Sequence, residues 1–200
     1  HLLGYSWGTA ICGAVAGRLP EAVERLVLLG ALWLKDVPSA IAGTEPPGAY
    51  RTVTADAALK RWLTGLDTEQ IKLIGTPAER LAWASATVMT DPSTGAGPDA
   101  FLRAPAGVVA DVMEFWAAGR PTYSPEAVRA PTLIVVGEWD HETTPEQGRE
   151  VFRRLEGAET KRYVLVGGAT HSMPLERMRT VLYATVLAFL DEGSPSPLES

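Results

Sequence analysis

The sequence predicts an α/β protein with a mostly parallel sheet flanked by helices. Short apolar runs of strand length alternate with helix-like stretches at both ends of the chain. The aliphatic runs at residues 25–30 and 131–137 are continuous rather than alternating, which is typical of parallel strands covered on both faces. The spacing of strand, helix and strand matches βαβ units.

The first such unit occupies the beginning of the chain. Residues 1–4 are predicted to form a short strand, broken by Tyr5-Ser6-Trp7-Gly8. Residues 9–19 are small and apolar and predict a helix, which ends before Pro20 because the residue preceding a proline is disfavoured in a helix. Residues 25–30 then form the second strand.

The same alternation resumes near the end of the chain. Residues 131–137 predict a strand, and residues 145–155 a helix with proline in its first turn. Residues 163–166 predict another strand, closed by two glycines, and residues 174–190 an amphipathic helix.

Between these parts, residues 38–123 show no strong strand over roughly 85 residues, which is too long for a plain connection. Apolar residues at helical spacing predict helices at 57–66, 77–90 and 107–118, and residues 91–98 have the composition of a flexible loop. We therefore divide the chain into a partial catalytic core (1–37 and 124–192), a helical lid or cap insertion (38–123) and a flexible tail (193–200).

Composition excludes several classes of protein. The 24 acidic and 18 basic residues give a net charge of −6 without a concentrated basic patch, which argues against nucleic-acid binding. No apolar run reaches membrane-spanning length, and Cys12, the single cysteine, cannot form an intrachain disulfide. No metal-ligand spacing or phosphate loop is visible, so we expect no metal or cofactor. We expect a cytoplasmic protein.

Gly4-Tyr5-Ser6-Trp7-Gly8 is a Gly-x-Ser-x-Gly motif directly after a predicted strand and before a predicted helix. A serine at such a sharp turn projects its hydroxyl clear of the sheet. We expect Gly4 and Gly8 to avoid collisions across the turn. The backbone N–H of Trp7 begins the helix, where it would stabilise an oxyanion.

A serine nucleophile requires a base, and the chain has three histidines. His171 lies in a glycine-rich loop after the last strand and can face the carboxyl edge of the sheet. We interpret His1 as a structural or terminal residue, and His141 as bordering the pocket or pointing to solvent. His171 is the predicted general base.

The predicted acid is Asp140, in the loop after residues 131–137, where it would accept the second N–H of the histidine. Glu138 and Glu142 compete for this role. Asp140 is preferred over Glu138, which still follows the direction of the strand, because three residues after Gly137 give the loop room to turn.

The order Ser6, Asp140, His171 resembles the α/β-hydrolase fold family. The likeness covers residues 4–30 and 131–190, and the segment between them matches only as the family's variable lid. The loop from Gly137 to Pro145 and the Gly-Gly-Ala-Thr-His171 loop are similar to the acid and histidine loops of small-molecule esterases.

The sequence departs from this family in one respect. Members carry several strands and a second oxyanion-hole donor before the motif, and in them the strand at residues 1–4 lies within the sheet. Alone, this strand would be an exposed apolar edge. The resemblance therefore implies an N-terminal portion of the fold, supplied by another chain or segment, that packs beside residues 1–4.

The predicted function is hydrolysis of a carboxylic ester or thioester of a small, largely apolar substrate through an acyl-enzyme on Ser6. The same triad could serve peptide or carbon–carbon hydrolysis, haloperoxidation or acyl transfer, and a non-catalytic binding homologue is the alternative class. Tryptophans in helices are typically core residues, but as a group they suggest an apolar pocket: Trp33, Trp62, Trp83, Trp116 and Trp139. Trp7 and Trp139 are the predicted substrate contacts.

Overall fold

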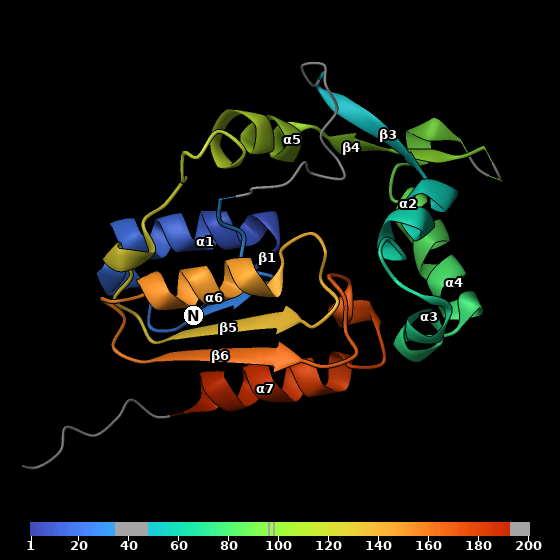
Figure 1. The fold of residues 1–200 in the computed structure, drawn as a ribbon. Coiled ribbons are helices and arrows are strands. Elements are labelled where there is room, and N and C mark those ends of the chain that lie inside the picture. Colours follow the sequence, from blue (N-terminus) through green and yellow to red (C-terminus); the bar gives the residue numbers. More distant parts are fainter. Residues whose placement is uncertain (35–47, 96, 98, 193–200) are drawn as a thin grey trace, which may run out of the picture.

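A parallel sheet organises the part of the chain that the computed structural model describes, residues 1–34, 48–95, 97 and 99–192. Its strand order is β1-β2-β5-β6, with every neighbouring pair parallel. The strands are β1 (Leu2–Tyr5), β2 (Leu26–Leu29), β5 (Thr132–Gly137) and β6 (Lys161–Val166). Helices cover both faces (Figure 1), which confirms the predicted α/β fold.

Two apolar layers enclose this sheet. Helices α1 (Trp7–Arg18) and α6 (Pro145–Arg154) pack on one face, and α7 (Arg179–Asp191) packs on the other. Successive side chains of a strand point to opposite faces, so Leu26 and Leu28 of β2 join the first layer whereas Val27 and Leu29 join the second. The continuous aliphatic run of β2 follows from this burial on both sides.

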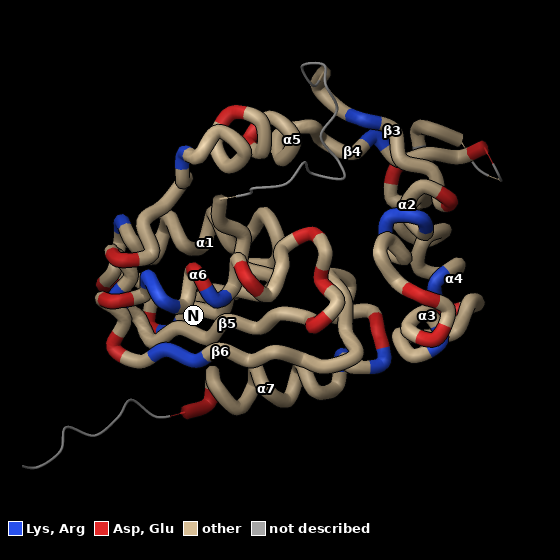
Figure 2. Tube along the Cα trace, viewed as in Figure 1, with Lys and Arg blue, Asp and Glu red and all other residues tan. Residues whose placement is uncertain are grey.

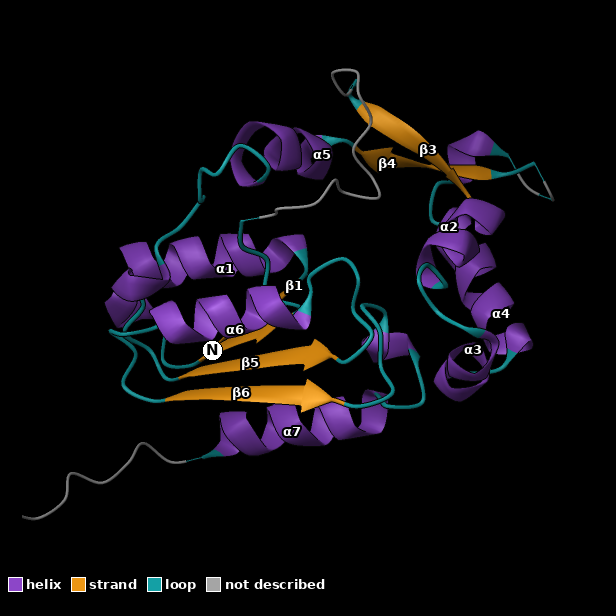
Figure 3. Cartoon of the chain, in the orientation of Figure 1, coloured by secondary structure: helices purple, strands orange, loops and turns teal. Residues whose placement is uncertain are grey.

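Residues 48–123, which we call the intervening segment, form a separate layer (Figure 3). Its helices α2, α3 and α4 lie beyond the carboxyl ends of β5 and β6, and α5 lies over α1 (Figure 1). The elements in chain order are β3 (Tyr50–Thr54), α2 (Ala55–Trp62), α3 (Thr68–Ile74), α4 (Pro77–Val88), β4 (Phe101–Pro105), α5 (Gly107–Asp111) and a π-helical turn, Val112–Trp116.

This segment, in which no strong strand was expected, contains two short strands. β3 and β4 pair antiparallel from Tyr50 with Pro105 to Thr54 with Phe101. Each strand is short and its partner lies far along the chain, so local patterning did not reveal the pair. The helices expected at 57–66 and 77–90 correspond to α2 and α4, whereas the third is divided between α5 and the π-helical turn. Helix α3 was not expected.

The last predicted helix also differs from the structure, because α7 begins at Arg179 rather than at residue 174. A 3-10 turn, Met173–Leu175, comes first, and Glu176 then has extended backbone angles (φ −94°, ψ 176°). These angles take the chain out of the helical path, and the Glu176 side chain is fully buried. The predicted tail (193–200) and the first ten residues of the predicted lid (38–47) lie outside the described residues.

The turn between β1 and α1 is sharply strained. Ser6 has φ 54° and ψ −121°, and it is the only non-glycine residue with a positive φ in the described ranges. A Cβ on Gly4 would lie 2.5 Å from the backbone oxygen of Gly8, as expected of a crowded turn. A Cβ on Gly8 would meet nothing within 4 Å, so the expected collision at Gly8 is wrong.

Charged residues of both signs are interleaved over the sheet layers and the intervening segment (Figure 2). Of the helices that the structure describes, none combines the length and apolar character needed to cross a bilayer.

We predict that Gly4→Ala lowers the free energy of unfolding by about 1–3 kcal/mol, because the new methyl group forces the backbone of the turn to move. Gly8→Ala is the matched control, since its methyl group enters open space on a helix, where alanine is favoured over glycine. Urea unfolding of both variants measures the difference. Equal destabilisation by the two substitutions would contradict the steric explanation.

Candidate functional site

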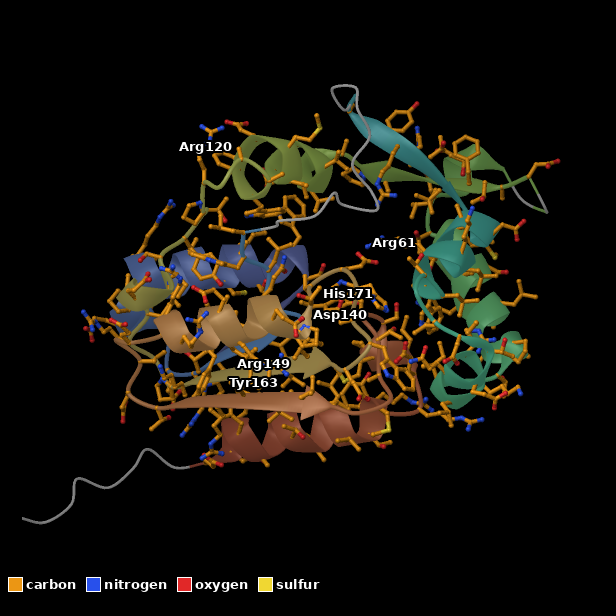
Figure 4. The ribbon with its side chains drawn as sticks, viewed as in Figure 1. Arg61, Arg120, Asp140, Arg149, Tyr163 and His171 are labelled. Atoms are coloured by element: carbon orange, nitrogen blue, oxygen red, sulfur yellow. The ribbon has the colours of Figure 1, made fainter. Side chains whose placement is uncertain are left out.

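Three loops at the carboxyl edge of the sheet bring Ser6, His171 and Asp140 together. His171 Nε2 lies 2.9 Å from Ser6 Oγ, and His171 Nδ1 lies 2.9 Å from Asp140 Oδ2. Asp140 follows β5, His171 follows β6, and Ser6 follows β1. Figure 4 shows Asp140 and His171 side by side above the end of β5. The structure thus assembles the three residues that the sequence singled out.

Asp140 is a buried carboxylate with a full set of donors. Its Oδ1 accepts the backbone N–H groups of Glu142 (2.9 Å) and Thr143 (2.8 Å), and Oδ2 accepts the hydroxyl of Thr143 (2.9 Å). The side chain of Asp140 is 2 % exposed and that of His171 is 10 % exposed. An ionised carboxylate only accepts hydrogen bonds, so a neutral His171 bonded to it would carry its proton on Nδ1 and direct the lone pair of Nε2 toward the hydroxyl of Ser6.

The strained turn at Ser6 is anchored to β2 and to the chain that follows it. The N–H of Ser6 donates to the carbonyl of Leu29 (2.9 Å). Thr9, which is fully buried, donates its hydroxyl to the carbonyl of Ser6 (2.6 Å) and accepts the N–H of Leu32 (2.9 Å). Such anchoring holds an unfavourable backbone conformation in place.

The loop that carries Asp140 (the acid loop) and the loop that carries His171 (the histidine loop) are in direct backbone contact. A Cβ on Gly137 would lie 2.5 Å from the carbonyl oxygen of Ala169 and 2.7 Å from that of Thr170. The N–H of Trp139 donates to the carbonyl of Ala169 (2.9 Å), which joins the loops through the backbone. Glycine at position 137 permits this approach, so the spacing of Asp140 and His171 depends on it.

Tyr5 contacts His171 through both its ring and its hydroxyl. Its ring stacks on the imidazole with centroids 5.1 Å apart, and its hydroxyl donates to the carbonyl of His171 (2.7 Å). Tyr5 is 40 % exposed, but partial desolvation of its phenol raises the pKa above its ordinary value, and the negative charge of Asp140 adds to the effect. Tyr5 is therefore a neutral hydrogen-bond donor over the usual pH range.

The two competing acids have other partners. Glu138 is exposed and accepts the backbone N–H of Gly168 (3.1 Å). Glu142 forms an ion pair with Arg61 of α2. Asp140 is thus the acidic residue that contacts His171.

The other two histidines lie apart from this hydrogen-bonded line. His1 precedes β1 rather than lying within it, and its Nδ1 is 3.6 Å from Glu24. His141 borders a small cavity of about 30 Å³ that is also lined by His171 and Trp139.

The predicted substrate contacts, Trp7 and Trp139, border different cavities. The N–H of Trp7 is at the first position of α1, where helical N–H groups have no partner within the helix. Its indole donates to Asp111 of α5 (2.7 Å) and borders an apolar cavity of about 490 Å³ along α1. Ser6 does not line this cavity. Among the remaining tryptophans, Trp33 and Trp116 belong to the core.

Sequence reasoning missed several residues that support the site. They are Tyr5, Thr143, Glu176, Arg61 and Asp111. Thr143 had a local signal, because an aspartate side chain commonly accepts the backbone N–H groups that follow it in a turn. Tyr5, Arg61 and Asp111 act through partners remote in sequence, as does Glu176 in its bond to Trp62, and no local pattern reveals such partners.

Comparison with known proteins agrees with this architecture. The family model described as "alpha/beta hydrolase fold" matches residues 1–177. A search of curated proteins finds no match. Because the family model covers most of the chain, the chain belongs to the α/β-hydrolase fold family, as the resemblance predicted.

Solved structures show the same fold. A serine hydrolase involved in carbazole degradation has a TM-score of 0.58 and 19 % identity over 94 % of this chain and 62 % of its own. The monoacylglycerol lipase of Paleococcus ferrophilus has a TM-score of 0.54 and 22 % identity over 94 % and 67 %. The enol-lactonase of Burkholderia xenovorans has a TM-score of 0.50 and 21 % identity over 95 % and 65 %. This chain therefore spans about two thirds of these proteins.

We predict that the destabilisation caused by Tyr5→Phe becomes smaller as the pH rises from 8 to 12. The folded chain retains the Tyr5 proton, whereas the unfolded chain releases it above about pH 10, so the stability that this phenol contributes declines above that pH. Urea unfolding of both proteins at pH 8 and pH 11 measures the difference. A constant or growing difference would contradict the raised pKa.

Proposed function

We propose that this chain is a serine hydrolase that cleaves a carboxylic ester or thioester of a small, largely apolar substrate. The observation that carries the proposal is the continuous hydrogen-bonded line from Ser6 through His171 to the buried carboxylate of Asp140. A hydroxyl, an imidazole and a carboxylate in this order are the parts of an acyl-transfer triad.

In the proposed reaction, Ser6 Oγ attacks the substrate carbonyl while His171 Nε2 takes the hydroxyl proton. Asp140 stabilises the imidazolium and fixes its orientation. His171 then gives the proton to the leaving alcohol or thiol, which leaves an acyl-enzyme on Ser6. Water repeats the sequence, with His171 as its base, and releases the acid.

The oxyanion of each tetrahedral intermediate would lie at the beginning of α1. The N–H of Trp7 and the positive end of the helix dipole favour negative charge there. The second oxyanion-hole N–H donor, and the N-terminal portion of the fold that would pack beside β1, remain predictions.

We further propose that the intervening segment acts as the lid. Support comes from its contacts with both sides of the site, through Trp7 with Asp111 of α5 and through Arg61 of α2 with Glu142. A lid in this position would determine which acyl and alcohol groups reach Ser6.

We predict that a fluorophosphonate labels this chain on Ser6 and that Ser6→Ala abolishes labelling, because an activated hydroxyl attacks phosphorus as it attacks a carbonyl. Ser85→Ala, on the exposed surface of α4, is the control and should label normally. Mass spectrometry of the labelled peptide identifies the site. A folded, complete protein, with the portion predicted beside β1 present, that remains unlabelled would favour the non-catalytic binding homologue.

We predict that Asp140→Asn lowers kcat on an activated ester about 10⁴-fold, because the amide favours the wrong histidine tautomer. Glu138→Gln tests the rival acid and should change kcat little, since Glu138 contacts the backbone of Gly168. Steady-state kinetics across a panel of p-nitrophenyl esters of increasing acyl length measures both variants and narrows the substrate class. The reverse ranking of the two variants would exclude Asp140 as the acid.

A further inference from the structure

Two consecutive residues of helix α2 contact the two loops that carry Asp140 and His171. Arg61 reaches the acid loop, where its Nε donates to Glu142 Oε1 (2.7 Å) and its Nη2 pairs with Oε2. Glu142 in turn donates its backbone N–H to Asp140 (2.9 Å). Figure 4 shows Arg61 on the side of α2 that faces this loop.

Trp62 makes the second contact. It is buried, and its indole N–H donates to Glu176 Oε1 (2.7 Å). Its ring also packs edge-on against Trp83 of α4, with centroids 4.9 Å apart, so Trp62 is held within the intervening segment. The bond to Glu176 joins this segment to the chain that follows β6.

Glu176 is the centre of this contact. It is fully buried, and its carboxylate accepts the backbone N–H of Thr170 at 2.9 Å and the hydroxyl of the same residue. A buried carboxylate is tolerated only when donors satisfy it, so the three bonds fix its position. Two of them end on the residue that immediately precedes His171.

The short chain around His171 is therefore closed into a ring. The carboxylate of Glu176 bonds to Thr170, and the backbone N–H of Glu176 donates to the carbonyl of Met173 (3.1 Å). His171 belongs to the segment 170–176 that these bonds close. A displacement of Trp62 would move Glu176 and hence the imidazole relative to Ser6.

We infer that Arg61, Trp62 and Glu176 are positioning residues, which together form a clamp that lets α2 hold the acid loop and the histidine loop at the spacing needed for proton transfer. The clamp acts through Asp140 and His171 and does not touch the reacting atoms. This inference rests on the proposed function, because it concerns the geometry of the proposed triad.

A clamp of this kind affects kcat more than KM. Misplacement of a catalytic group by about 1 Å can lower the rate about 100-fold even when the substituted residue is remote. A residue that only stabilises the intervening segment, or only contacts substrate, would change the unfolding curve or KM and leave the proton transfer unaltered.

The test compares Trp62→Phe, Arg61→Met and Glu176→Gln with two matched controls in the intervening segment. Trp116→Phe removes another indole hydrogen bond, to Thr122, and Arg103→Met removes another ion pair, to Asp91. Hydrolysis of p-nitrophenyl butyrate gives kcat and KM. Proton NMR records the downfield resonance of His171 Nδ1–H, which reports the bond to Asp140 without requiring turnover.

We expect each clamp variant to lose about 10- to 100-fold in kcat at nearly constant KM, and to shift or broaden the His171 resonance, while both controls keep the values of the unmodified chain. If Glu176→Gln does not fold, Trp62→Phe carries the test, because it keeps an aromatic ring against Trp83. The clamp would be overturned if the His171 resonance were the same in all the proteins, if the clamp variants changed KM alone, or if the controls lost as much kcat as the clamp variants.

The NMR arm separates this inference from the proposed function. An unmodified protein that carries the portion predicted beside β1 and still hydrolyses no ester, but whose His171 resonance changes only in the clamp variants, would sustain the clamp and refute the hydrolase.

Discussion

The bond between the buried carboxylate of Asp140 and the imidazole of His171 is the interaction on which the rest of the site depends. A carboxylate that is 2 % exposed is stable only with donors on both oxygens, and the acid loop supplies them through Glu142 and Thr143. This arrangement fixes the direction in which His171 points. Ser6 can then face the imidazole from a turn whose backbone is itself strained.

The parallel sheet brings these loops together, because the loops that follow parallel strands lie at the same edge. β1, β5 and β6 run in one direction, so the turns after them end at one edge although β1 is separated from the other two by more than 100 residues in sequence. The two central strands, β2 and β5, are buried along their whole length. The N–H of Ser6 donates to Leu29 of β2, and Gly137 ends β5, so the strained turn and the close approach both adjoin these buried strands.

The contacts between the intervening segment and the site are polar and specific. The indole of Trp62 meets a buried carboxylate, and Arg61 meets the acid loop, so the position of the segment is linked to that of the site. Known proteins with this fold include a lipase and an enol-lactonase by their descriptions. One fold can carry such different reactions, because function resides in sites built on a fold rather than in the fold itself.

The sequence by itself determined the α/β class, the strands at 25–30 and 131–137, and the choice of Ser6, Asp140 and His171, because hydrophobic period and turn chemistry are local properties. Asp140 could be preferred over its neighbours only through its distance from the end of a strand. Tertiary structure alone decided the pairing of β3 with β4, the role of Tyr5, and the bond of Glu176 to Trp62. The partners in these contacts lie tens to more than a hundred residues apart, so only the folded chain defines them.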